Sequence, residues 1–135
     1  LGAPAGSALV GSAELIARAK RVRKMAGGTM RQAGILAAAA MHALDHHIDR
    51  LADDHARARR LAEGLQGLPG VTVQMPPTNM VFIDLPRERA AAAVAALREQ
   101  GVLSTGLYQL RLVTHLDVND EQIDQAIAAL RRALH

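Results

Sequence analysis

The hydrophobic pattern of the chain changes its period at Pro69 and Gly70, and this change constrains the fold more than any other feature of the sequence. Before this point, apolar residues recur at helical spacing, which predicts a helix from about residue 48 to residue 67. After it, short apolar runs at 71–74 and 80–85 predict strands. Helices that give way to short strands indicate an α/β class of fold, in which helices are layered on a sheet.

The second half continues with further strands and helices. The expected elements are, in order, a helix over 88–100 closed by Gly101, strands at 102–103 and 110–113, and a helix starting at Asn119. Asn119 and Gln122 have the three-residue spacing of a capping box. The inward face of this last helix would carry Ile123, Ala126, Ile127 and Leu130. The predicted order is β-β-α-β-β-α, an α+β domain with helices on a small mixed sheet.

The first half is predicted to contain one short strand and two helices. An apolar run between glycines, residues 7–11, is typical of a strand buried on both faces. Ser12 is a suitable N-cap for a helix that runs to about Met25. A second helix should extend from about Arg31 to Leu44, and its four consecutive alanines indicate a buried helix that packs closely against other backbone.

Composition excludes several classes of protein. The mean hydropathy is +0.06, and no apolar run reaches the ~18 residues that a membrane span needs. The chain has no cysteine, which excludes a disulfide scaffold and predicts a cytoplasmic protein. Aromatic residues make up 1% of the chain, which is too few for base-stacking platforms. The cationic run at 18–24 is explained by a solvated helix face, so we expect neither a nucleic-acid nor a membrane partner.

Three patterns could carry chemistry. His42 and His46 have the four-residue spacing of helical zinc ligands, but no glutamate lies between them and we expect no metal. Residues 114–117, Thr-His-Leu-Asp, contain the residue types of a catalytic triad, although neighbours in sequence rarely take triad geometry and a loop is the better interpretation. Arg111 lies inside the apolar strand 110–113, where a guanidinium needs an anionic partner because unpaired buried charge is costly. Either a protein acid or a bound ligand would serve.

Several stretches together resemble the low-specificity L-threonine aldolases, pyridoxal-phosphate enzymes with the fold type of aspartate aminotransferase. The stretches are residues 1–7, the run Arg23–Gly34 with its Arg-Lys-Met, Gly-Gly and Met-Arg-Gln motifs, Asp54-His55, residues 78–82, and Leu110–Asp117. Their order and spacing cover nearly the whole chain. Thr29 is a mild departure, since the family often has a third glycine there. The resemblance implies the C-terminal portion of a pyridoxal-phosphate-dependent transferase-like fold.

The resemblance also implies how this segment relates to a longer protein. The lysine that binds the cofactor covalently would lie two residues before Leu1. Residues 1–45 would form the tail of the large cofactor-binding domain and the start of a linking helix, and residues 46–135 would form the small domain. The segment would contain no catalytic residue of its own and would be inactive alone.

Site residues follow from the same resemblance. It implies that Arg111 binds the substrate carboxylate, which agrees with the independent argument about its charge. It further implies that Arg31 and Lys24 approach the cofactor, pyridoxal 5'-phosphate, near a subunit boundary.

The activity implied is cleavage of L-threonine or L-allo-threonine to glycine and acetaldehyde by a homo-oligomer, either a tetramer or a dimer of dimers. Two alternatives stay open. One is a β-eliminating lyase of the same fold type, which would share the lysine and the carboxylate contact. The other is a non-catalytic module that binds a protein or nucleic acid.

Overall fold

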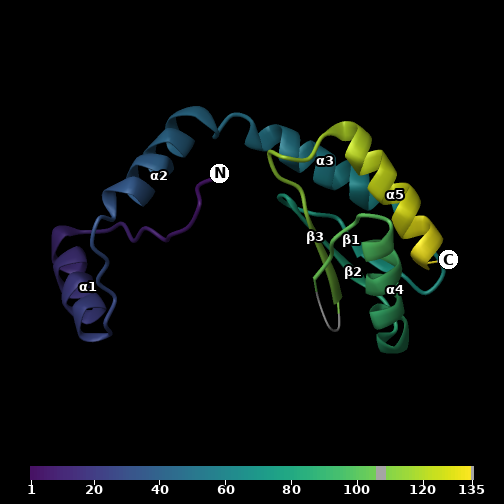
Figure 1. Cartoon of the computed structure of the whole chain (residues 1–135), viewed down its shortest axis with the longest axis horizontal. Helices are drawn as coiled ribbons and strands as arrows, with labels where there is room; N and C mark the ends of the chain where they lie inside the picture. Colours follow the sequence, from purple (N-terminus) through teal and green to yellow (C-terminus); the bar gives the residue numbers. More distant parts are fainter. Residues whose placement is uncertain (106–108, 135) are drawn as a thin grey trace. The chain divides into compact units, whose positions relative to one another are not determined.

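The computed structural model describes residues 1–105 and 109–134, and this part of the chain contains five helices and three strands (Figure 1). It divides into two compact units, Leu1–Asp49 and Arg50–His135, called here the N-terminal and the C-terminal unit. None of the helices in the described residues is long and apolar enough to cross a membrane.

A three-stranded antiparallel sheet forms the base of the C-terminal unit. Its strands are β1 (Thr72–Gln74), β2 (Met80–Asp84) and β3 (Gln109–Val113), in the spatial order β1-β2-β3. The central strand β2 places Asp84 opposite Thr72 and Met80 opposite Val113. The three strands expected from the sequence at these places are confirmed, and the α/β fold class with them. The sheet is antiparallel, however, where a mixed sheet was expected.

The fourth expected strand, at residues 102–103, is absent from the described sheet. Val102 N donates to the Leu97 carbonyl over 2.9 Å, which extends the turn at the end of α4 (Arg87–Glu99). Leu103 is 79% exposed. The prediction was wrong because two adjacent apolar residues do not distinguish a strand from a helix terminus that packs on its own last turn.

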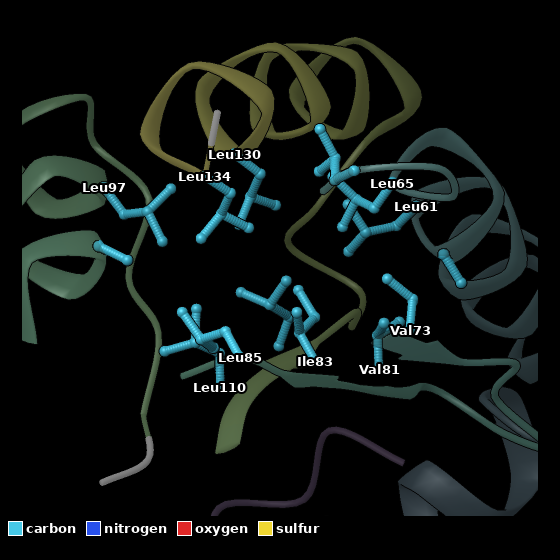
Figure 2. Packing of buried hydrophobic residues seen from close by; sticks show 14 of the residues in the cluster. Leu61, Leu65, Val73, Val81, Ile83, Leu85, Leu97, Leu110, Leu130 and Leu134 are labelled. Carbon is cyan, nitrogen blue, oxygen red and sulfur yellow. The ribbon is translucent and has the colours of Figure 1, made fainter. Parts of the chain in front are cut away.

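Three helices cover one face of this sheet: α3 (Leu51–Gly64), α4 and α5 (Asp120–Leu134). Figure 2 shows their side chains pointing toward those of the strands, and the labelled residues are Leu61, Leu65, Val73, Val81, Ile83, Leu85, Leu97, Leu110, Leu130 and Leu134. Because side chains alternate along a strand, every second residue of β2 and β3 enters this core and the residues between them face away.

The start of α5 confirms the capping box. Asn119 N donates to Gln122 Oε1 and Gln122 N donates to Asn119 Oδ1, each over 2.9 Å. Ile123 and Leu130 are buried, as the spacing predicted, and Ala126 and Ile127 pack against the same core while partly exposed.

Ion pairs join the outer surfaces of α3 and α5. Arg57 Nε lies 2.7 Å from Asp120 Oδ1, and Arg60 Nη2 lies 2.7 Å from Asp124 Oδ2. The hydrogen bond that Arg57 donates to Asp120 raises the pKa of the Arg57 guanidinium above its ordinary value, although partial desolvation opposes it. Exposed pairs of this kind contribute little to stability, so the helices are held mainly by the core beneath them.

The N-terminal unit contains α1 (Ala13–Met25) and α2 (Gly34–His46). Ser12 caps α1, since its Oγ accepts from Leu15 N over 3.2 Å. The helix ends in a left-handed turn at Gly27, which has φ +76°, followed by a bond of 2.8 Å from Gly28 N to the Arg23 carbonyl. This glycine stop ends α1 at Met25, where the sequence predicted the helix to end.

Two expectations for the N-terminal unit are wrong. Residues 7–11 form no strand, because an isolated strand needs hydrogen-bonding partners and the described residues pair none with it. The alanine-rich helix α2 is not buried: Ala43 is its one fully buried residue, and Ile35 is 77% exposed. Small side chains permit close packing, but burial requires a second apolar surface. Within this unit, α2 and the opening residues of the chain line a shared pocket.

We expect Gly64→Ala to destabilise the contact between α3 and α5 by about 1–2 kcal/mol. An added Cβ would lie 2.7 Å from Ile127 Cδ1 and 3.0 Å from its Cγ atoms. Overpacking of this kind costs about 1–3 kcal/mol of stability. The better helix propensity of alanine offsets part of this cost. The measurement is amide hydrogen exchange in α5 of the full-length protein, which should become faster.

Gly34→Ala is the matched control, since a Cβ at that position meets nothing within 4 Å. It should leave exchange in α5 unchanged, because Gly34 is the first residue of α2 and alanine is the better helix former there. Slower exchange in α5 of the Gly64 variant would contradict the overpacking argument.

Candidate functional site

The sheet of the C-terminal unit presents a polar face on the side away from α3, α4 and α5. We call it the open sheet face, and its residues are Thr72, Gln74, Met80, Phe82, Asp84, Gln109, Arg111 and Val113, all exposed or half-buried. Their positions follow from the period-two alternation of the three strands. The face combines one cation, one carboxylate, two amides, one hydroxyl and three apolar side chains.

Arg111 lies in the middle of β3 on this open sheet face, directly opposite Phe82 of β2. Its neighbours Leu110 and Leu112 are 0% and 5% exposed, whereas Arg111 itself is exposed. The expectation of a buried guanidinium was therefore wrong, because an apolar run in a half-buried strand includes outward positions. Within the described residues Arg111 has no salt-bridge partner, so an anion can reach it.

Asp84, the carboxylate of the open sheet face, accepts hydrogen bonds from two neighbouring side chains. Gln74 Nε2 donates to Asp84 Oδ2 over 3.1 Å, and Gln109 Nε2 donates to Asp84 Oδ1 over 2.7 Å. Both amides come from the strands that flank β2, so the three side chains form a row across the sheet. Asp84 thereby satisfies its oxygens without Arg111, which leaves the guanidinium available for a ligand.

Thr114 lies directly after β3 and points to the opposite side, into the protein. It is 1% exposed, and its Oγ1 donates to the Asp54 carbonyl over 2.7 Å. Asn79 Nδ2 donates to the Thr114 carbonyl over 2.8 Å, and Thr114 N donates to the Asn79 carbonyl over 3.0 Å. These bonds connect the ends of β2 and β3 to the first part of α3.

The Thr-His-Leu-Asp stretch does not form a triad. The Thr114 hydroxyl is used inside the protein, while His115 and Asp117 are exposed, with His115 Nδ1 3.6 Å from Asp117 Oδ2. A triad requires the hydroxyl and the acid to contact the same imidazole. The interpretation of this stretch as a loop after a strand is confirmed.

Asp54 completes the polar cluster behind the sheet. Its side chain is 4% exposed and receives two bonds from Arg50, from Nη2 over 2.6 Å and from Nη1 over 3.0 Å. A buried carboxylate needs such a partner, because desolvation of an unpaired charge is costly. The sequence contains a signal for this pair, the i,i+4 spacing of Arg50 and Asp54 at the start of a helix. The role of Asp54 in the cluster depends on Thr114, which is sixty residues away in the sequence.

The two further cations expected at a site lie in the N-terminal unit. Lys24 is in the last turn of α1, and Arg31 lies between α1 and α2. Both are exposed, and neither has a salt-bridge partner in the part of the chain that the structure describes. Gln32, next to Arg31, has φ +52°, a left-handed conformation that costs a non-glycine residue on the order of 1 kcal/mol. Strain of this kind is common where a backbone is shaped for binding.

The histidines of α2 pack against one another. The rings of His42 and His46 have centroids 4.4 Å apart, and His47 meets His42 edge-on at 5.4 Å. His47 Nδ1 lies 2.5 Å from the Leu1 carbonyl oxygen. Across the described ranges 1–105 and 109–134, no three potential ligands are grouped so as to hold a metal ion.

Solved structures share the fold of this chain. A transaminase with L-alanine has a TM-score of 0.66 at 23% identity, over 90% of this chain and 34% of that one. A putative aromatic amino acid beta-eliminating lyase/threonine aldolase from Exiguobacterium sp. 255-15 has a TM-score of 0.62 at 20% identity, over 90% of this chain and 38% of that one. The chain therefore has the α/β fold of part of a pyridoxal-phosphate-dependent transferase.

Sequence relatives narrow the class to a family. The model of the Beta-eliminating lyase family matches residues 1–88, and the chain belongs to this family. Low specificity L-threonine aldolase of Escherichia coli (strain K12) is 46% identical over 134 residues, 99% of this chain and 40% of that protein. Probable low-specificity L-threonine aldolase 2 of Arabidopsis thaliana is 36% identical over 142 residues, 100% of this chain and 40% of that protein. The predicted resemblance to the low-specificity L-threonine aldolases is confirmed, and the chain spans about 40% of the length of these curated relatives.

Proposed function

We propose that the chain is part of a pyridoxal-phosphate-dependent aldolase that cleaves L-threonine or L-allo-threonine to glycine and acetaldehyde. The names of its relatives and its family support this activity. The observation that carries the proposal is Arg111, a cation without a salt-bridge partner among the described residues, placed on the open sheet face.

Arg111 would bind the α-carboxylate of the amino acid. Its planar guanidinium can donate two parallel N–H bonds to the two carboxylate oxygens, and such charge-assisted pairs are about twice as strong as neutral ones. Two contact points also fix the rotation of the substrate, so the bond between Cα and Cβ is held in one direction. Orientation of the reacting bond is a large part of what a protein contributes to such a reaction.

The cations of the N-terminal unit fit the phosphate of the cofactor. Lys24 and Arg31 are exposed and have no salt-bridge partner in the described residues, and phosphate oxygens prefer guanidinium and ammonium donors. When bound, pyridoxal 5'-phosphate supplies the electron sink that accepts charge from the substrate Cα. In this proposal the lysine that holds it lies two residues before Leu1.

The proposal extends to domain organisation and assembly. Residues 1–45 would belong to the large cofactor domain and the linking helix, and residues 46–135 would form the small domain. The division of the chain between Asp49 and Arg50 supports a boundary close to this point. We further propose a cytoplasmic homo-oligomer, a tetramer or a dimer of dimers, in which Lys24 and Arg31 lie near a subunit boundary.

Product analysis of the full-length protein tests the proposed activity. With pyridoxal phosphate and L-threonine, we expect glycine and acetaldehyde in equal amounts. The family also includes enzymes described as beta-eliminating lyases, and elimination would instead release ammonia and a keto acid. Ammonia without glycine would replace the aldolase proposal by the lyase alternative, and no turnover of either kind would contradict both.

A further inference from the structure

We propose that Thr114 and Asp54 are positioning residues that hold β3 so that Arg111 meets the substrate carboxylate at two points. The proposal rests on the function proposed for Arg111. The group that performs this task is the polar cluster behind the sheet, formed by Arg50, Asp54, Asn79 and Thr114, which we call the Thr114 clamp.

Thr114 occupies a position where β3 would otherwise continue its apolar inward row. Leu110 and Leu112 point into the core, Arg111 and Val113 point to the open sheet face, and Thr114 is the next residue inward. A buried hydroxyl is unfavourable unless it is hydrogen-bonded. Its bond of 2.7 Å to the Asp54 carbonyl satisfies this requirement. The same bond also favours one position of β3 relative to α3.

Hydrogen bonds restrict this contact in a way that apolar packing does not. Leucine contacts are non-directional and depend mainly on the area buried, so they resist sliding of a strand along a helix only weakly. A hydrogen bond tolerates a few tenths of an ångström and a limited angle. The Thr114 hydroxyl therefore joins the end of β3, which the sheet already pairs with β2, to the start of α3.

The other members of the clamp make this anchor rigid. Arg50 holds the Asp54 side chain with two bonds, of 2.6 and 3.0 Å, at the start of α3. Asn79 joins the start of β2 to Thr114 through its side chain, over 2.8 Å, and through its backbone carbonyl, over 3.0 Å. One helix and two strands are thus joined at Thr114, directly after β3 and three residues along the chain from Arg111.

A small displacement of β3 would affect binding of the carboxylate more than any other step. Two-point contacts require donors within about 0.5 Å of their productive positions. Because the Arg111 guanidinium itself remains, a substrate that does make the two-point contact should react at nearly the parent rate, and loss of the clamp should appear mainly as a higher KM. Cofactor binding should not change, because no clamp residue is among those proposed to hold the phosphate.

Thr114→Val in the full-length holoenzyme is the test, because valine keeps the shape and removes the hydroxyl. We expect the KM for L-threonine to rise about tenfold, because the free energy of the lost bond is the most by which that bond can favour the binding-competent position of β3, with kcat changed by less than about threefold. Thr114→Ser, which restores the hydroxyl, should return KM to within about threefold of the parent value. Ile123→Val is the matched control: it weakens the same core at a residue 2% exposed but outside the clamp, and should lower the melting temperature without moving KM.

The results separate this inference from the proposed function. An unchanged KM in a folded Thr114→Val enzyme overturns the positioning role while the aldolase activity stands. If that variant fails to fold, Asn79→Ala serves in its place, since it removes one bond of 2.8 Å at a half-buried side chain. It should raise KM about three- to tenfold, and an unchanged KM there overturns the inference equally. An inactive parent enzyme contradicts the proposed function itself.

Discussion

Arg111→Lys is expected to lower kcat/KM for L-threonine on the order of 100-fold in the full-length enzyme. A lysine ammonium keeps the charge but cannot make the planar two-point contact with a carboxylate. Hydrogen bonds to charged groups contribute about 1.5–3 kcal/mol each, so the loss of one bond together with the orientation it gives corresponds to this factor. The measurement is steady-state kinetics, with the affinity for pyridoxal phosphate determined by titration in parallel.

The pattern of the loss identifies the role of Arg111. If it orients the substrate, kcat should fall as well as KM rise, because misdirected substrate is bound but reacts slowly. The cofactor affinity should stay within about twofold of the parent value, since Arg111 is not assigned to the phosphate. Arg59→Lys is the control, because Arg59 is also exposed in the C-terminal unit and is not on the open sheet face. Parent-like kinetics of Arg111→Lys would remove Arg111 from the site.

Local sequence signals predicted the elements that depend on local physics. The capping box of α5 needs only Asn119 and Gln122, three residues apart, and both of its bonds are present. The stop of α1 needs a residue that accepts positive φ, and Gly27 supplies it. The strands at 80–84 and 109–113 follow from short apolar runs bounded by turn signals. In the capping box and the helix stop, the energy that decides the structure comes from neighbours along the chain, whereas the strands also depend on pairing with one another.

Predictions that depended on a distant surface were less successful. Whether α2 is buried depends on what packs against its alanines, and nothing in its own sequence specifies that. Residues 7–11 have the composition of a buried strand, but a strand exists only where another segment offers hydrogen bonds. Arg111 was expected to be buried because its neighbours are apolar. The alternation of β3 turned it outward, which brought it to the open sheet face.

In the candidate site, too, local sequence predicted one part and distant contacts determined the other. Arg111 could be selected from sequence because a cation in an apolar run is unusual. The clamp behind it could not, since Thr114 and Asp54 are sixty residues apart, and a threonine after a strand or an aspartate in the first turn of a helix is common. Only the fold brings the hydroxyl to the carbonyl. Polar residues at inward positions of predicted elements are the signal that could have suggested it.

Leu130→Ala is expected to destabilise the C-terminal unit by about 2–5 kcal/mol, the usual cost of this truncation in a closed core. Leu130 is 0% exposed and points from α5 toward the sheet, among leucines of α3 and α4 (Figure 2). Its neighbours belong to helices that pack on the same sheet, so they should fill the space only in part. Amide hydrogen exchange of β2 and β3 in the full-length protein should accelerate roughly 30-fold to several thousandfold, by the conversion of 1.36 kcal/mol per factor of ten.

Leu103→Ala makes the same chemical change at a residue that is 79% exposed, and it should leave exchange in β2 and β3 within about twofold of the parent value, as surface substitutions usually do. The comparison tests whether the packing of α5 stabilises the sheet that carries Arg111. If the amides of β2 and β3 exchanged as slowly in Leu130→Ala as in Leu103→Ala, the core beneath α5 would not stabilise these strands. The rigidity of the open sheet face would then have to come from other contacts.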